Sequence, residues 1–489
     1  MTSSCLHALS SSQPISVKMS RVESTKETTN LRELAYVRRR PVSGRTVRAI
    51  SSKIITSKAH YRQNNQEAGG GGGAHDNKSL DFVYYSDSEE DDGDGPDTTF
   101  PISCSFVDCM QNRQLGLHKR FQTMRISSEY GTRHMLSNSM MKEREVKIGN
   151  MNKVFCSQWL SHKQVMFGTK CNKLVVMDVS TRRIDHIPSL VSSERSVPPD
   201  IERGINSIEI NPSRTLLSTA ATNSNDVAVY RLPTLDPICV GESGHRDWIF
   251  DQTWIDDQFF VSGSRDGTIA LWRITDQMIR EVTETEIPKH QYMTPLLIKP
   301  CKGADKVRAV CFNNRSEEIA VISINSYIHC WNARTMKQIM SKRLPHTLEN
   351  CCMVPDEEYQ LYAVGSKSHA DLLDSRTLQS VRKISSRHSG CGIRSVSFKG
   401  NILTLGTGTG LLLFWDLRAS KWLESTMNSN RGVQIKAGRG WVDRDEYDQY
   451  NKYNPAIYTH CYDVSGTRLF AAGGPLQNST MGNYVGLFQ

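Results

Sequence analysis

The sequence predicts an all-β fold, a seven-bladed β-propeller, because short motifs recur along it at one fixed interval. The tripeptides that begin at Asn332, Asp374 and Asp416 follow one another at steps of 42 residues. Tyr230 and Trp272, each at the end of a short apolar run, are separated by the same step. A period of about 40–45 residues with strand-like content is typical of four-stranded propeller blades.

The strand-like segments form seven sets, one for each blade, within residues 142–489. The first six begin near residues 153, 204, 244, 306, 346 and 392, and the seventh starts near residue 457. Because the seventh set has only three strands, we expect residues 143–149 to supply its outer strand and so close the ring. Two stretches that interrupt the period, about 276–305 and 420–456, are expected to be surface loops.

The third blade carries the polar pattern of a WD repeat. In order along the chain, the pattern consists of His245, Ser262, Ser264, Asp266 and Trp272. A Ser–His–Asp triad could be assembled from these residues, but WD blades use the same groups to satisfy one another in a buried network. We therefore assign His245, Asp266 and Trp272 to structure, together with one of the two serines.

A glycine-rich stretch, residues 406–410, resembles a phosphate-binding loop. Such a loop must lead into a helix whose N-terminus meets the anion. Here a strongly apolar strand follows at residues 411–415, so the glycines are expected to form a turn between two strands. With no acid–base pair, metal set or nucleophile left over, we predict a non-enzymatic protein that needs no cofactor.

The composition restricts the class of protein further. The chain has 489 residues and a net charge of +9, which leaves room for acidic partners without requiring nucleic acid. Its 13 cysteines include no Cys-x-x-Cys pair, so reduced thiols are expected rather than disulfides or zinc. The N-terminal residues lack the apolar run of a secretory signal, and no stretch reaches transmembrane length. We expect no membrane partner, and a location in the cytoplasm and nucleus.

Residues 1–100 are expected to form a disordered tail. They combine a basic segment from Arg38 to Arg48, a glycine run at 69–73 and an acidic cluster at 86–92. Such a composition cannot bury enough apolar surface to offset chain entropy. The next segment, 101–141, contains a short helical stripe that either packs on the propeller or docks a partner. The members of this stripe are Ile102, Phe106, Val107 and Met110.

Basic residues recur at equivalent positions of several predicted blades. They lie in the turns between the second and third strands, or at the start of the first strand. Because both places lie on one face of a propeller around its channel, we expect an anion-binding pocket there. A short acidic peptide suits such a funnel better than duplex DNA, although Lys and Arg also favour solvated turns in general. The predicted pocket residues are Lys153, Lys170, Arg265, Arg308, Lys367 and Arg394.

The sixth blade ends in Trp415-Asp416-Leu417-Arg418, which resembles the WD-x-R box of substrate receptors of the cullin-4 RING ubiquitin ligase. Other strings similar to this family run from KVF-x-SQWL in the first blade, through SGSRDG in the third, to FAAGGPL in the last. The resemblance covers about residues 142–489 and includes turn residues that the generic repeat does not fix.

This resemblance implies a non-catalytic receptor that docks on a triple-propeller adaptor and recognises targets ending in two glutamates. It assigns the acidic C-terminus of the target to five of the six basic residues, whereas Lys367 belongs to the set by geometry alone. On the adaptor side it places Arg418, with Asp416 beside it, and the helix from Ile102 to Leu117. Asp416 and Arg418 also have a structural interpretation, because many propellers use this pair to brace the corner between their outer strands.

Two other functions stay open on the residues alone. A ligase-independent scaffold could bind acidic motifs through the same face, and it would not need residues 100–120. A propeller that binds nucleic acid through the arm from Arg38 to Arg48 would lose affinity steeply with salt and would not depend on peptide termini.

Overall fold

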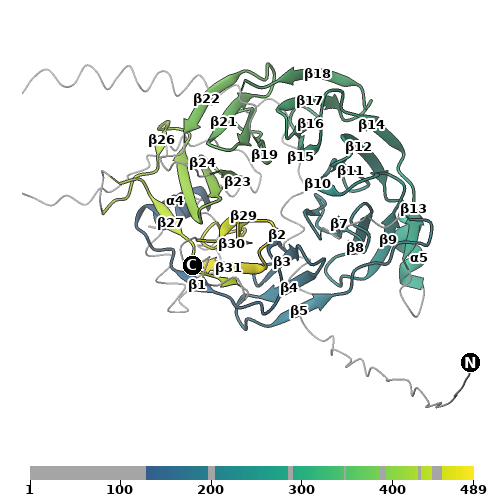
Figure 1. The fold of residues 1–489 in the computed structure, drawn as a ribbon, viewed down its shortest axis with the longest axis horizontal. Coiled ribbons are helices and arrows are strands. Elements are labelled where there is room, and N and C mark those ends of the chain that lie inside the picture. The colour runs from purple at the N-terminus through teal and green to yellow at the C-terminus, as the bar shows by residue number, and fades with distance from the viewer. Residues whose placement is uncertain are drawn as a thin grey trace, which may run out of the picture. The chain divides into compact units, whose positions relative to one another are not determined.

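Seven β-sheets stand around a central channel in the computed structural model (Figure 1). The structure describes residues 128–196, 204–284, 290–345, 349–385, 392–427, 431–442 and 454–489. This arrangement confirms the seven-bladed β-propeller predicted from the repeat. Each blade has its innermost strand at the channel, and the chain then moves outward strand by strand.

The first three blades follow the period closely. Blade 1 contains β2 (Val154–Trp159), β3 (Gln164–Thr169), β4 (Leu174–Asp178) and β5 (Ile184–Ile187). Blade 2 contains β6 (Ile208–Ile210), β7 (Leu216–Ala220), β8 (Val227–Arg231) and β9 (Pro237–Gly241). Blade 3 contains β10 (Ile249–Trp254), β11 (Phe259–Ser264), β12 (Thr268–Arg273) and β14 (Leu297–Pro300).

The next three blades repeat the same order. Blade 4 contains β15 (Val307–Asn313), β16 (Glu318–Ser323), β17 (Tyr327–Asn332) and β18 (Gln338–Arg343). Blade 5 contains β19 (Cys352–Asp356), β20 (Leu361–Gly365), β21 (His369–Asp374) and β22 (Ser380–Ser385). Blade 6 contains β23 (Ile393–Lys399), β24 (Ile402–Thr407), β25 (Leu411–Asp416) and β26 (Lys421–Trp422). The glycines between β24 and β25 form the expected turn.

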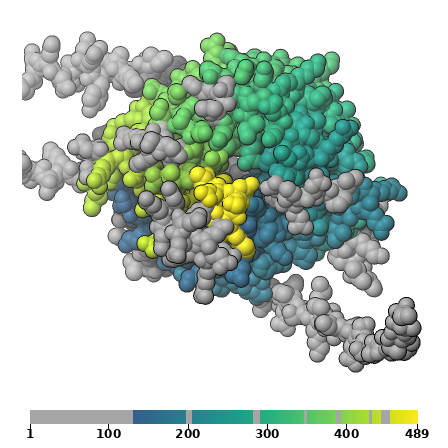
Figure 2. Space-filling view, viewed as in Figure 1, coloured from purple at the N-terminus to yellow at the C-terminus, as the bar shows by residue number. Residues whose placement is uncertain are grey.

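Blade 7 takes its strands from both ends of the propeller. Three of them, β29 (Ala456–Tyr462), β30 (Leu469–Gly474) and β31 (Gly482–Phe488), come from the C-terminal residues. The fourth is β1 (Glu143–Glu145), which pairs antiparallel with β31, so that Glu143 lies opposite Phe488. Figure 2 shows blade 7, in yellow, against blade 1, in blue. The closing strand therefore lies within the stretch that the sequence indicates.

The two stretches expected to be surface loops contain secondary structure, so that expectation is wrong. Residues 276–305 form α5 (Asp276–Glu284), then β13 (Gln291–Met293), which adds to blade 2 in parallel with β9, and then β14. Residues 420–456 include β26, β27 (Gln434–Lys436), which pairs with β25, and β28 (Trp441–Val442), which pairs with β31. Outer strands are short and mostly exposed, so their sequences lack the apolar pattern by which inner strands are recognised.

Apolar side chains fill the spaces between neighbouring blades. In the described part of the chain, each of seven buried clusters joins two adjacent blades. Phe167 of blade 1 and Phe470 of blade 7, for example, stack with their ring centroids 5.9 Å apart. Burying such rings contributes about 1.5–3 kcal/mol each, so the blades stabilise one another around the whole ring.

The polar pattern of blade 3 is a structural network, as predicted. His245 Nε2 lies 2.7 Å from Ser262 Oγ, and Trp272 Nε1 donates to the same hydroxyl at 2.8 Å. His245 Nδ1 lies 3.4 Å from the Asp266 carboxylate. Ser262 is thus the structural serine, whereas Ser264 donates to the backbone oxygen of Asp247 at 2.7 Å. The network is too enclosed to act on a substrate.

A helix that was not predicted from the sequence, α4 (Ser128–Ser137), precedes β1, the closing strand of blade 7. Its Met135 and Leu136 are buried in the cluster between blades 6 and 7. Thr132 Oγ1 donates to the backbone oxygen of Gly466 at 2.8 Å. The predicted tail and the predicted helical stripe at residues 102–110 lie outside the described residues.

Ring closure can be tested at Glu143. Its carboxylate accepts hydrogen bonds from Tyr484 Oη at 2.6 Å and from the Gly438 amide at 3.0 Å. Glu143→Ala leaves both donors unpaired, so we expect the free energy of unfolding to fall by about 1–3 kcal/mol in chemical denaturation. Glu145→Ala, on the same strand but exposed, is the control and should change it by less than about 0.5 kcal/mol. Equal losses in both variants would show that the Glu143 contacts do not stabilise the closure.

Candidate functional site

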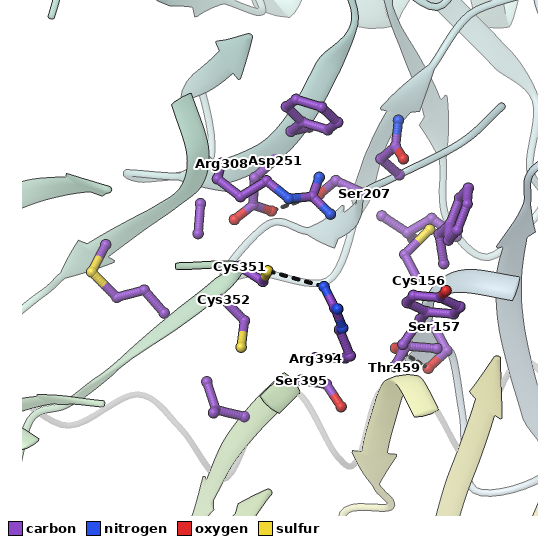
Figure 3. Close-up of a pocket in the computed structure, with 18 of the residues that line it drawn as sticks. Cys156, Ser157, Ser207, Asp251, Arg308, Cys351, Cys352, Arg394, Ser395 and Thr459 are labelled. Atoms are coloured by element: carbon purple, nitrogen blue, oxygen red, sulfur yellow. Dashed lines mark hydrogen bonds between the residues drawn. The ribbon is translucent and has the colours of Figure 1, made fainter. Parts of the chain in front are cut away.

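A pocket of about 230 Å³ opens within the channel and is lined by residues from the inner strands of all seven blades (Figure 3). Two of the six predicted cations, Arg308 and Arg394, line it directly. They come from blade 4 and blade 6, and Figure 3 shows both side chains reaching into the same space.

An irregularity of the inner strands aims side chains into this pocket. In β2, β10, β15 and β23 the pairing with the next strand shifts by one residue at the second position, and in β29 it does so at the third. Such a β-bulge leaves the extra residue out of the ladder and redirects its side chain. The five bulge residues, all of which line the pocket, are Phe155, Phe250, Arg308, Arg394 and Tyr458.

Arg308 is held by an aromatic ring rather than by an acid. Its guanidinium lies over the ring of Phe250, with 4.2 Å between the guanidinium carbon and the ring centroid. Within the part of the chain that the structure describes, no hydrogen bond or ion pair engages its N–H groups. A guanidinium that stacks through its face keeps the donors at its edge for another group, and a carboxylate matches their geometry.

Arg394 is partly engaged. Its Nη1 donates to Cys351 Sγ at 3.4 Å, and its Nη2 lies 3.4 Å from a carboxylate oxygen of Glu349. Both distances are long for bonds to a guanidinium, which are usually about 2.7–2.9 Å to a carboxylate. The Nε atom is buried and has no acceptor among the described residues. A buried donor without an acceptor is unusual in a native structure and indicates a place where a ligand can bind.

The opposite side of the pocket is aromatic, which the sequence analysis missed. Phe155 meets Tyr458 edge to face with 5.4 Å between the ring centroids. Tyr458 Oη donates to the backbone oxygen of Pro475 at 3.3 Å, which fixes its ring. When the inner strands of the blades are aligned, Phe155, Phe250 and Tyr458 stand at the same position as Arg308 and Arg394. Aligning all the blades in this way would therefore have identified the three aromatic residues from the sequence.

Two carboxyl groups lie deeper in the pocket wall. Asp251 accepts from Ser207 Oγ at 3.1 Å and from the Val310 amide at 2.9 Å, so it connects blades 2, 3 and 4. Burial raises the pKa of Asp251 to about 6, although these hydrogen bonds and the charge of Arg308 act in the opposite direction. Burial, and then the nearby Asp251, raise the pKa of Glu209 to about 8. The pocket thus gains negative charge between mildly acidic and mildly basic pH.

The other four predicted cations surround the pocket without lining it, and each has a partner within the chain. Lys153 is buried and donates to the backbone oxygen of Gln477, while Lys170 Nζ donates to Asn478 O at 2.6 Å. Arg265 lies 3.1 Å from the Asp247 carboxylate and over the ring of Trp248. Lys367 Nζ lies 3.5 Å from Glu349. The binding role of all six residues stays a prediction.

Comparison with known protein families identifies the propeller. Residues 137–489 match the family described as the DDB1- and CUL4-associated factor 12 beta propeller. The chain belongs to this family. The match covers most of the chain, and it confirms the resemblance to the cullin-4-associated family that the sequence indicates. The family's description associates it with DDB1 and CUL4.

Two distant relatives are protein kinases. A non-specific serine/threonine protein kinase of Candida glabrata is 26% identical over 190 residues, which make up 35% of this chain and 13% of that protein. Serine/threonine-protein kinase VPS15 of Saccharomyces cerevisiae is 23% identical over 177 residues, or 34% of this chain and 12% of that protein. Because the chain spans so small a part of these relatives, the similarity does not indicate kinase activity.

The residues predicted to face the adaptor differ in their surroundings. Asp416 is buried, accepts from the Arg418 and Ala419 amides at 3.0 and 3.2 Å, and forms an ion pair with Arg133 of α4. Its carboxylate therefore braces the corner after β25 and fixes α4 to blade 6. The side chain of Arg418 is exposed and, among the described residues, has no hydrogen-bond or ion-pair partner. Of the two, Arg418 is the one that a partner could reach.

The described residues offer no cluster of His, Cys, Asp and Glu suited to a metal ion. The cysteines in the described ranges are free thiols, and several of them, such as Cys311, are buried. No described helix is long and apolar enough to cross a bilayer.

Proposed function

We propose that this protein is a non-catalytic substrate receptor of a cullin-4 RING ubiquitin ligase, and that its channel pocket binds the acidic C-terminus of a target. The observation that carries the proposal is the pair of arginines in one pocket: Arg308 with its edge unengaged and Arg394 with an unpaired Nε. Membership of a cullin-4-associated family supports the ligase part of the proposal.

A C-terminus that ends in two glutamates suits this pocket chemically. It presents one main-chain and two side-chain carboxylates on adjacent residues, so several fixed cations are needed to offset their loss of hydration. Arg308 and Arg394 would bind them first, and Lys153, Lys170, Arg265 and Lys367 would act from the surrounding turns. The aromatic wall of Phe155 and Tyr458 would pack against the methylene groups of the glutamates.

On the ligase side, we propose that the adaptor binds at Arg418 and at the helical stripe of Ile102, Phe106, Val107 and Met110. Arg418 lies near α4, because the adjoining Asp416 is bound to Arg133 of that helix. The stripe precedes α4, which begins at Ser128, in the sequence. A receptor of this kind would act in the cytoplasm and nucleus.

The direct test is binding of a fluorescent peptide that ends in Glu-Glu, measured by polarisation beside the same peptide with an amidated C-terminus. We expect the free acid to bind and the amide to bind much more weakly, because the amide removes one carboxylate. Equal binding of both forms, or of neither, would contradict a pocket that reads the terminus.

Arg308→Glu should abolish peptide binding while leaving the fold intact, because the side chain lies at a bulge outside the core. Replacing a buried charged contact with a like charge should cost at least about 2–5 kcal/mol of binding free energy. Arg343→Glu is a matched control: it makes the same charge change in blade 4, and Arg343, on the outer strand β18, also lies over an aromatic ring, that of Tyr327. Normal peptide binding by Arg308→Glu would refute the site.

Peptide affinity should fall as the pH rises from about 6 to about 8. Asp251 has a pKa of about 6 and Glu209 of about 8, so each becomes negative in this range and repels an acidic ligand. His460, also in the pocket, stays neutral throughout because burial lowers its pKa to about 4. Glu209→Gln should remove the upper part of the pH dependence. A flat profile in the parent would mean that the ligand binds away from these acids.

Arg418→Ala should weaken co-purification with the DDB1 adaptor and leave peptide affinity unchanged, because Arg418 is exposed and remote from the channel. Arg376→Ala is the control, since Arg376 occupies the equivalent position of blade 5, where the motif lacks the tryptophan. Loss of peptide binding in Arg418→Ala would indicate damage to blade 6 instead of an adaptor contact.

A further inference from the structure

A carboxylate of the chain itself forms ion pairs with two of the cations that are predicted to bind the ligand. Glu349 precedes β19, and its two oxygens lie 3.4 Å from Arg394 Nη2 and 3.5 Å from Lys367 Nζ. Neither the repeat nor the resemblance draws attention to this residue.

The backbone at Glu349 is unusual. Its φ is +47°, in the left-handed region that residues with a side chain rarely adopt. Its backbone oxygen accepts a hydrogen bond from Cys351 Sγ at 3.2 Å, and the same sulfur accepts from Arg394 Nη1. The left-handed turn therefore places the Glu349 carboxylate beside Arg394, at the edge of the pocket.

We infer that Glu349 is an internal competitor for the acidic ligand and so determines which ligands bind. This inference rests on the proposed function of the pocket. A ligand carboxylate can bind Arg394 Nη2 and Lys367 Nζ only by displacing that of Glu349, which needs a rotation of one side chain. A ligand with a single carboxylate then binds Arg308 alone. A terminus with several carboxylates also displaces Glu349 and binds Arg394 and Lys367.

The geometry favours competition over a purely structural role. Both ion-pair distances exceed the 2.7–2.9 Å that is usual for a bond between a guanidinium or ammonium group and a carboxylate. The Glu349 side chain is 41% exposed, so it can leave its partners for water. Arg394 keeps its Nε without an acceptor even with Glu349 in place. A residue that served only to orient Arg394 would be expected to engage that nitrogen.

The test compares Glu349→Gln with the parent chain in the Glu-Glu peptide assay. Removing the competing charge should tighten binding by about three- to tenfold at low salt, in the range of a partly exposed ion pair. Glu317→Gln is the matched control, because Glu317 also has a left-handed backbone (φ +53°), is 44% exposed and pairs with an arginine, Arg334. It lies between β15 and β16, at the opposite end of blade 4 from Arg308, so it should leave the affinity unchanged.

The outcomes separate this inference from the function on which it rests. Tighter binding by Glu349→Gln but not by Glu317→Gln supports competition, and the gain should shrink when Arg394→Gln is added. Weaker or unchanged binding by Glu349→Gln would overturn it and show that Glu349 orients Arg394 or is inert, while the receptor proposal would stand. If neither the parent nor Glu349→Gln binds the peptide, both proposals fail.

Discussion

The pairing of β1 with β31 is the contact on which the rest of the structure depends. Blade 7 is complete only when a strand from residues 143–145 joins three strands from the C-terminal part of the chain. The buried clusters that join adjacent blades can all form only around a closed ring. Because the pocket is lined by the inner strands of every blade, the separation of Arg308 from Arg394 is fixed by closure and not by either blade alone.

The period of 42 residues was sufficient to predict the fold, because every blade repeats the same buried inner strands. The network of His245 and Ser262 was predictable for the same reason, since its members have fixed places in the repeat. The outer strands were not: β13, β14 and β27 pair through backbone hydrogen bonds and have only one buried side chain among them, Met293, so their sequences resemble loops. Helix α4 could not be predicted either, because it is stabilised by the packing of Met135 and Leu136 against blades 6 and 7, which are distant in the sequence.

The candidate site was only half predictable. Arg308 and Arg394 stood out because both occupy the same repeat position and both carry a charge. Their surroundings could not be deduced in this way, because they depend on which distant side chains approach: Phe250 beneath one arginine, and Glu349 beside the other. Six cations are equivalent in the sequence, whereas among the described residues Arg308 has no hydrogen bond or ion pair and the other five are already engaged by groups of the chain.

Because of the bulges in the inner strands, the residues that line the pocket differ from those that stabilise the fold. Five blades each contribute the bulge residue of their inner strand to the pocket, whereas Asn206 and Cys351 line it from just before β6 and β19 in blades 2 and 5. These side chains project from the ladder and take little part in the packing between blades. A substitution at such a position can therefore change what the channel selects at small cost to folding. Evolution can therefore alter the ligand specificity of this propeller by single substitutions at these positions. Protein engineering could change its specificity in the same way.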